Sequence, residues 1–164
     1  MLIGNPDRVA FLIERIPEWE ESNWKNGLLF FLIKGQLFPK EVRTTTLNCE
    51  FPAFLGEEHS PLLHPIVDLE LYTLADELLF RQIAQRTYPS DVNTDNDYSF
   101  SVELHEINDA GFAVFILSNE KSVKFLIGQC MEESYQLIDT VEIPVVEHKQ
   151  IILGLKQYYN NELV

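Results

Sequence analysis

Residues 112–143, with the sequence FAVFILSNEKSVKFLIGQCMEESYQLIDTVEI, decide the fold of this chain. Three apolar runs, over 112–117, 123–129 and 135–143, are rich in β-branched and aromatic residues. Short polar segments that are typical of turns separate them. A run of alternating apolar and polar residues over 98–107 precedes them. Four strands joined by short turns predict an antiparallel meander.

The N-terminal third predicts a second group of strands. Arg8 to Ile16 is rich in β-branched and aromatic residues, which favour a strand. The densest apolar run, Leu28 to Ile33, is followed by a short turn and by Leu37-Phe38, so residues 24–38 predict a tight hairpin. The β-branched content of residues 42–47 predicts a further extended segment.

Helices complete the predicted fold. Asp68 is a candidate N-cap for a central helix over Leu69 to Arg86, which contains no Pro or Gly and carries an apolar stripe at helical spacing. The same spacing predicts a C-terminal helix over about Val146 to Asn161, and Asn48 is expected to cap a short helix over 51–55. Runs of strands followed by single helices predict the α+β class, with a mainly antiparallel sheet packed against the helices.

The charge of the chain is strongly acidic and unevenly placed. Its 164 residues contain 12 Lys and Arg against 26 Asp and Glu, a formal net charge of −14. Residues 1–50 are nearly balanced, so almost the whole imbalance follows residue 50. Such a chain lacks the basic patch that direct nucleic-acid binding needs, and attachment to an anionic membrane is disfavoured. The acidic part is either a solvated surface or a docking face for a basic partner.

Composition and length predict a single globular domain over residues 1–164, in the cytoplasm. The chain is 46% hydrophobic, which excludes a disordered acidic tail. Its N-terminus has no basic segment, and Pro6-Asp7 interrupts any apolar signal sequence. The longest apolar run is far too short to cross a bilayer. Cys49 and Cys130 form no metal or disulfide pattern and are expected to be buried thiols.

The sequence contains no recognisable catalytic, cofactor or metal motif. It lacks the Gly-rich phosphate loops, the nucleophile elbow and the zinc-ligand spacings that mark common enzymes. His59 and His64 fall in a proline-containing segment that predicts a surface loop. Glu103 and His105 would share one face of a strand, so they are either a general acid and base pair or part of an exposed polar stripe.

Two tryptophans frame an acidic linker, Trp19-Glu20-Glu21-Ser22-Asn23-Trp24. Exposed indole rings beside carboxylates would suit a basic partner. The alternative, which the neighbouring apolar strand favours, is that both rings pack on the core.

The N-terminal third also carries a set of short motifs at defined separations. These are Ile3-Gly4-Asn5-Pro6, Phe11 with Glu14, Glu18-Trp19, Trp24-Lys25-Asn26-Gly27, Lys34-Gly35, Phe38-Pro39 and Thr44-Thr45-Thr46-Leu47-Asn48. In this combination, over residues 1–55, the chain resembles the immunity protein 42 (Imm42) family of bacterial polymorphic-toxin and contact-dependent growth inhibition loci. The motifs bear no catalytic chemistry and are interpreted as turn, hairpin and cap residues.

The resemblance implies a non-enzymatic protein that binds a cognate toxin domain and blocks its active site or substrate path. Many such toxins are nucleases with basic surfaces, which an acidic inhibitor would suit. Because specificity varies on loops carried by a constant scaffold, the contact surface is sought among acid-rich loops and turns. The candidates are Asp91, Asp95 and Asp97, then Glu132 and Glu133, then Glu57 and Glu58.

Two other function classes remain open. One is a small-molecule enzyme with chemistry at Glu103 and His105, which would require a cavity beside them. The other is an adaptor domain that uses Trp19 and Trp24. The unbound protein is expected to be a monomer without a cofactor.

Overall fold

The computed structural model describes residues 1–56, 60–131 and 134–164. Its first sheet is antiparallel in the order β1 (Leu2–Asn5), β2 (Val9–Arg15), β3 (Asn26–Ile33) and β4 (Gln36–Phe38). The short β5 (Thr45–Thr46) also pairs with β3. The hairpin predicted over 24–38 is present, with Lys34 and Gly35 at its turn in the positive-φ conformation.

The second sheet is the meander, in the order β6 (Ser101–Val102), β7 (Phe112–Ser118), β8 (Ser122–Met131) and β9 (Ser134–Pro144). The register pairs Phe115 with Leu126, so alternate side chains of β7 and β8 face opposite sides of the sheet. Both sides of these two strands are buried. The meander is therefore the middle layer of the molecule.

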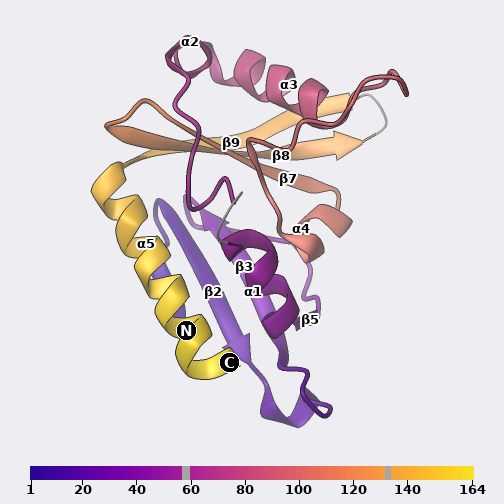
Figure 1. Cartoon of the computed structure of the whole chain (residues 1–164), viewed down its shortest axis with the longest axis vertical. Helices are drawn as coiled ribbons and strands as arrows, with labels where there is room; N and C mark the ends of the chain where they lie inside the picture. The colour runs from indigo at the N-terminus through magenta and orange to yellow at the C-terminus, as the bar shows by residue number, and fades with distance from the viewer. Residues whose placement is uncertain (57–59, 132–133) are drawn as a thin grey trace.

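Helices lie on both sides of the meander (Figure 1). α2 (Leu69–Tyr72) and α3 (Asp76–Thr87) cover its outer face, where Phe80 packs on Phe115 with ring centroids 5.2 Å apart. The other elements are α1 (Leu47–Leu55), α4 (His105–Asp109), α5 (Val145–Tyr158), the 3-10 turn η1 (Pro17–Trp19) and the π-helical turn η2 (Tyr159–Leu163). These observations confirm the α+β class.

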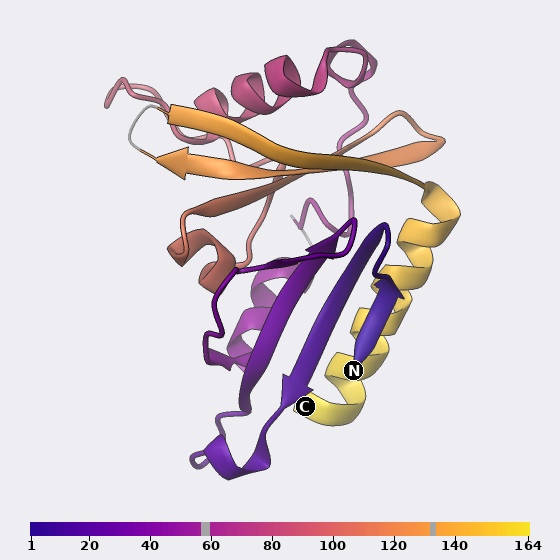
Figure 2. The same cartoon turned by 180° about the vertical axis from the view of Figure 1, so that it is seen from behind.

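The main core lies between the two sheets. Phe11 and Phe31 of the first sheet, Phe54 of α1 and Leu155 of α5 are essentially inaccessible to solvent. Phe31 meets Phe125 of the meander, with ring centroids 6.0 Å apart. α1 and α5 thus cover the inner face of the first sheet. Figure 2 shows the opposite face of that sheet, with no helix over it.

Several predicted boundaries are wrong, and each error has a tertiary cause. The strand predicted over 98–107 is only Ser101–Val102, and residues 105–109 form α4 instead. The first amide groups of α4 find distant or local side-chain acceptors: His105 N donates to Glu50, and Leu104 N donates to Asn108. Backbone groups that are satisfied in this way have no need of a strand partner.

The predicted central helix is broken into α2 and α3 at residues 73–75, although it lacks Pro and Gly. Asp68 caps α2 as predicted, since its carboxylate accepts from Leu71 N. The break is supported by Lys124 of β8, whose Nζ lies 2.9 Å from Asp76 Oδ1 and 3.4 Å from the Tyr72 carbonyl. One cation therefore stabilises the carboxyl end of α2 and the first turn of α3.

Two smaller expectations also differ from the structure. Asn48 does not cap a helix. Its side chain accepts from Lys25 N and donates to the Asn23 carbonyl, and α1 begins at Leu47. The extended segment predicted over 42–47 contributes only the two residues of β5. The C-terminal helix is close to its expected bounds. None of the helices in the described part of the chain is both long and apolar enough to cross a bilayer.

Candidate functional site

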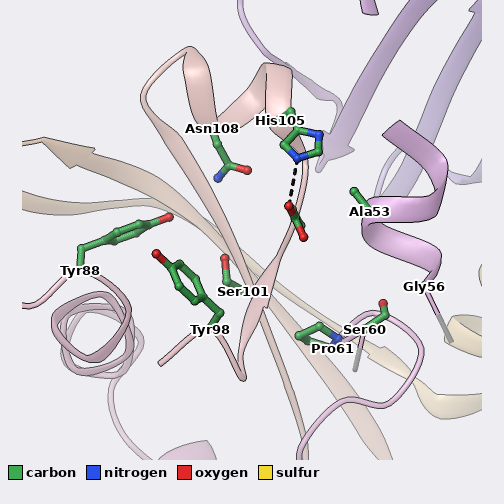
Figure 3. A pocket seen from close by; sticks show the side chains of 10 residues that line it. Ala53, Gly56, Ser60, Pro61, Tyr88, Tyr98, Ser101, His105 and Asn108 are labelled. Carbon is green, nitrogen blue, oxygen red and sulfur yellow. Dashed lines mark hydrogen bonds and ion pairs between the residues drawn. The ribbon is translucent and has the colours of Figure 1, made fainter. Parts of the chain in front are cut away.

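A cavity of about 760 Å³ opens beside α4, between α1 and the segment that joins α3 to β6 (Figure 3). Its volume is in the range of roughly 300–1,000 Å³ that is usual for binding sites. The lining combines small apolar groups, two tyrosines and several polar side chains. These residues are Ala53, Gly56, Ser60, Pro61, Tyr88, Tyr98, Ser101, Glu103, His105 and Asn108.

His105 and Glu103 form one wall of this cavity, and they belong to a chain of three ionisable groups that ends at the buried Glu50. His105 Nδ1 lies 2.9 Å from Glu50 Oε2, and His105 Nε2 lies 2.9 Å from Glu103 Oε1. Glu50, on α1, is only 3% exposed, whereas the side chain of Glu103 is 62% exposed. One imidazole therefore joins a buried carboxylate to one that faces solvent.

The two carboxylates determine the protonation of His105. Burial opposes the charged imidazole, but hydrogen bonds and charge attraction from Glu50 and Glu103 outweigh it, so the pKa of His105 is raised. Burial raises the pKa of Glu50, and its contacts with His105 oppose that shift.

Two tyrosines form the facing side of the cavity. Tyr88 follows the last turn of α3, and its backbone N–H donates to the Ala84 carbonyl. The Tyr88 and Tyr98 rings meet edge to face with centroids 6.4 Å apart. In Figure 3 the two hydroxyl groups lie close to each other, with the Tyr98 hydroxyl directed toward Tyr88. The intervening loop is tied to the end of α3, because Asn96 donates to the Thr87 carbonyl and Thr87 donates to the Asp97 carbonyl.

The structure places Asp91, Asp95 and Asp97 in that loop, which leads from α3 toward β6. Asp97 borders an adjoining hollow that shares Ser60, Pro61 and Tyr98 with the cavity. Hydrogen bonds from Ser99 lower the pKa of Asp97, and hydrogen bonds from Asn93 lower the pKa of Asp91. These carboxylates are therefore charged at neutral pH. Glu57, Glu58, Glu132, Glu133 and His59 lie outside the described residues.

Asp91 also lies near the start of β9. It lines a shallow hollow of about 320 Å³ together with Pro89 and Tyr135. Tyr135 donates its hydroxyl hydrogen to the Tyr88 carbonyl at 2.5 Å, which connects β9 to the same loop. The acidic loop is thus in contact with the meander edge.

The packed position predicted for the tryptophans is wrong. Trp19 is 42% exposed and Trp24 is 52% exposed, in the connection between β2 and β3. Within this linker, Glu20 is held by Arg15 at 2.5 Å and by Lys25 at 3.4 Å. Cys49 is also exposed rather than buried, and Cys130 is half-buried.

The site combines a cavity with a carboxylate–imidazole–carboxylate chain. The cavity that the enzyme hypothesis required is present beside Glu103 and His105. Both ring nitrogens of His105 are engaged by carboxylates, one by Glu50 and one by Glu103. In the described residues, no cluster of three or more His, Cys, Asp or Glu side chains is arranged to hold a metal ion.

Sequence reasoning missed Glu50 and the two tyrosines. Glu50 lies 55 positions before His105, and its sequence neighbours give no sign that it is buried against α4. Tyr88 and Tyr98 flank the acidic loop, and aromatic residues at both ends of a polar loop were the available signal.

The comparisons with known proteins agree with this fold. The family model for immunity protein 42 matches residues 1–158. Among solved structures, the crystal structure of CdiI from Burkholderia dolosa AUO158 matches with a TM-score of 0.77 and 22% sequence identity, over 96% of this chain and 99% of that chain. At this identity the likeness shows a shared fold. A search of curated proteins found no match. The family match spans nearly the whole chain, so this chain belongs to the immunity protein 42 family.

Proposed function

We propose that this chain binds the toxin domain of a contact-dependent growth inhibition system and neutralises it by covering its active site or substrate path. The family match over residues 1–158 carries this proposal. Inhibition by binding needs no catalytic group, and the doubly engaged His105 agrees with that mode of action. The protein would act as a single domain in the cytoplasm, where it would meet an incoming toxin, and would be monomeric before binding.

The acidic end of the molecule is the proposed toxin-binding surface. It comprises Asp91, Asp95 and Asp97 of the loop after α3, together with Glu103 at the mouth of the cavity. With a formal net charge of −14, the chain would attract a basic partner and accelerate their encounter. A nuclease is the toxin class that fits best, because carboxylates would occupy the positions that its substrate phosphates use.

Co-expression tests the function directly. A toxin domain taken from a reading frame adjacent to this gene is induced in cells with and without this chain. Restored growth, together with a complex of the two purified proteins, is the expected result. Toxicity that persists in the presence of folded chain would contradict the proposal.

Charge reversal tests the surface. A variant with Asp91, Asp95 and Asp97 all changed to Lys should associate with the toxin at least about tenfold more slowly at low salt, and with a weaker salt dependence. The control variant reverses the exposed Asp7, Glu41 and Glu70 to Lys, which gives the same net charge. If both variants associate equally fast, the acidic loop is not the contact surface.

The exposed tryptophans support a second candidate function, an adaptor domain that uses the β2–β3 connection. Aromatic side chains of this kind are frequent interface hot spots. A Trp19→Ala and Trp24→Ala double variant that still rescues cells from the toxin, but loses a housekeeping partner in pull-downs, would favour the adaptor. Loss of rescue would instead place the tryptophans in the toxin interface.

A further inference from the structure

The cavity beside α4 has an electrostatic character that the acidic loop alone does not explain. Its wall includes His105 and the exposed Glu103, and the buried Glu50 contacts His105 from behind, so two carboxyl groups accompany one imidazole. Only Oε1 of Glu103 is engaged among the contacts between described residues. Its second carboxylate oxygen is therefore available as a hydrogen-bond acceptor at the cavity mouth.

The facing side of the cavity is aromatic. Tyr88 and Tyr98 pack edge to face, and Figure 3 shows their two rings side by side on the side of the cavity opposite His105. Ring faces of this kind attract cations within about 6 Å of the centroid. Ala53 and Pro61 add small apolar groups to the lining. The combination suits a ligand that has an apolar stem and a cationic head.

The surroundings reinforce the preference for a cation. Asp97 borders the adjoining hollow, and its pKa is lowered by hydrogen bonds from Ser99, so it stays charged at neutral pH. Glu103 and Asp97 therefore line two neighbouring hollows that have Tyr98 in common. A planar guanidinium can stack on a tyrosine and donate to a carboxylate at the same time, which an ammonium does less well.

We propose that this cavity receives one arginine side chain of the bound toxin, with its guanidinium between the Tyr88–Tyr98 pair and the Glu103 carboxylate. The inference rests on the proposed function, and it names the anchor that the acidic surface would hold. A long side chain seated in a cavity of this size would be a hot spot, because it is enclosed on several sides while the loop acids remain solvated.

The first experiment uses the full chain and a blocked amino acid, so it does not need the toxin. N-acetyl-arginine N-methylamide is titrated while backbone amide resonances are recorded by NMR, with N-acetyl-citrulline N-methylamide as the uncharged isostere. Saturable shifts at Tyr98, Ser101, Glu103 and His105 are expected, with at least about tenfold weaker binding of the citrulline compound. Equal binding of the two compounds, or shifts confined to other parts of the surface, would overturn the proposal.

Variants assign the interaction to the cavity. Glu103→Gln should weaken arginine-amide binding at least about tenfold, while Asp109→Asn, an exposed acid at the last residue of α4, should leave it unchanged. Tyr98→Ala is an independent variant on the opposite wall, and thermal unfolding checks that each variant is folded. Equal affinities for Glu103→Gln and Asp109→Asn would contradict the assignment.

The toxin complex separates the two proposals. Faster dissociation of the complex formed by Glu103→Gln, at least about tenfold relative to Asp109→Asn, is expected. If the wild-type chain binds the toxin but Glu103→Gln dissociates no faster, the cavity inference fails and the proposed function stands. If the arginine amide binds as expected but the wild-type chain neither binds nor neutralises the toxin, the proposed function fails.

Discussion

Glu50 holds both the backbone and the side chain of His105: its Oε1 accepts from His105 N at 2.7 Å, and its Oε2 lies 2.9 Å from His105 Nδ1. One carboxylate on α1 thereby fixes the start of α4, 55 positions along the chain. The bidentate contact also orients the imidazole toward Glu103. The wall of the cavity is thus set by a buried residue that does not itself line the cavity.

The contact with Glu50 predicts a measurable change in the titration of His105. Glu50→Gln keeps a hydrogen-bonding side chain but removes the charge, so the pKa of His105 should fall from its raised value. An NMR titration of the imidazole carbons measures this directly. Asp109→Asn serves as the control and should leave the pKa unchanged. An unchanged His105 pKa in Glu50→Gln would show that Glu50 does not stabilise the imidazolium.

Stability should depend on pH through His105 with a defined sign. Because the folded pKa is raised, the contribution of His105 to the free energy of unfolding is fully present below its ordinary pKa of 6.5 and is lost as pH rises through the folded value. The difference in stability between wild type and His105→Asn should therefore shrink with rising pH. Urea denaturation at a series of pH values measures it, and a difference that grows with pH would contradict this assignment.

His148 on α5 should act in the opposite direction. It is 3% exposed, and its Nε2 lies 2.8 Å from the Leu62 carbonyl. Burial lowers its pKa, against the effect of the hydrogen bond, so folding favours the neutral ring. The contribution of His148 is present above pH 6.5 and is lost as pH falls from there through the folded pKa. His148→Gln can still donate to the Leu62 carbonyl, and it should lose less stability than the wild type as pH falls below 6.5. If the variant and the wild type lose stability equally steeply, His148 is not the source of the acid sensitivity.

The strands were predictable where burial and pattern agree. Phe112 to Leu117 is apolar throughout because both faces of β7 are buried, and the hairpin at Lys34-Gly35 follows from local turn chemistry. Contacts over long sequence separations decided the rest. Lys124 supports the break between α2 and α3, and Glu50 accepts a hydrogen bond from the first amide of α4. Neither contact can be recognised from the residues adjacent to it in the sequence.

The candidate site was predictable only in part, for the same reason. The pairing of Glu103 with His105 was anticipated from spacing on a strand, and the two side chains do meet, although His105 stands on a helix. The acidic loop was visible as composition. Its relation to the cavity depends on how Asn96 and Thr87 fold the loop back onto α3, which composition does not encode.

The exposure of both tryptophans predicts an unusual fluorescence response. The chain has only two Trp, and both are more than 40% exposed. The native protein should therefore show the red-shifted emission of hydrated indole and a small further shift on unfolding. Trp19→Ala and Trp24→Ala should each change the free energy of unfolding by at most about 0.5 kcal/mol. Blue-shifted native emission that moves strongly to the red in urea would show instead that the rings are packed.

Gly128 provides the sharpest test of the packing between α3 and the meander. It lies in β8 at a shift of the register with β9, and an added Cβ would fall 2.2 Å from Phe80 Cζ and 2.4 Å from the Gln136 carbonyl oxygen. The carbonyl belongs to the paired strand and cannot move independently, so Gly128→Ala should destabilise the protein by about 2–3 kcal/mol.

Gly35→Ala is the control, since nothing lies within 4 Å of its added Cβ and only the cost of its positive φ, about 1–2 kcal/mol, remains. Chemical denaturation compares the two variants, and a Gly128→Ala protein as stable as wild type would mean that α3 does not sit against β8 as described.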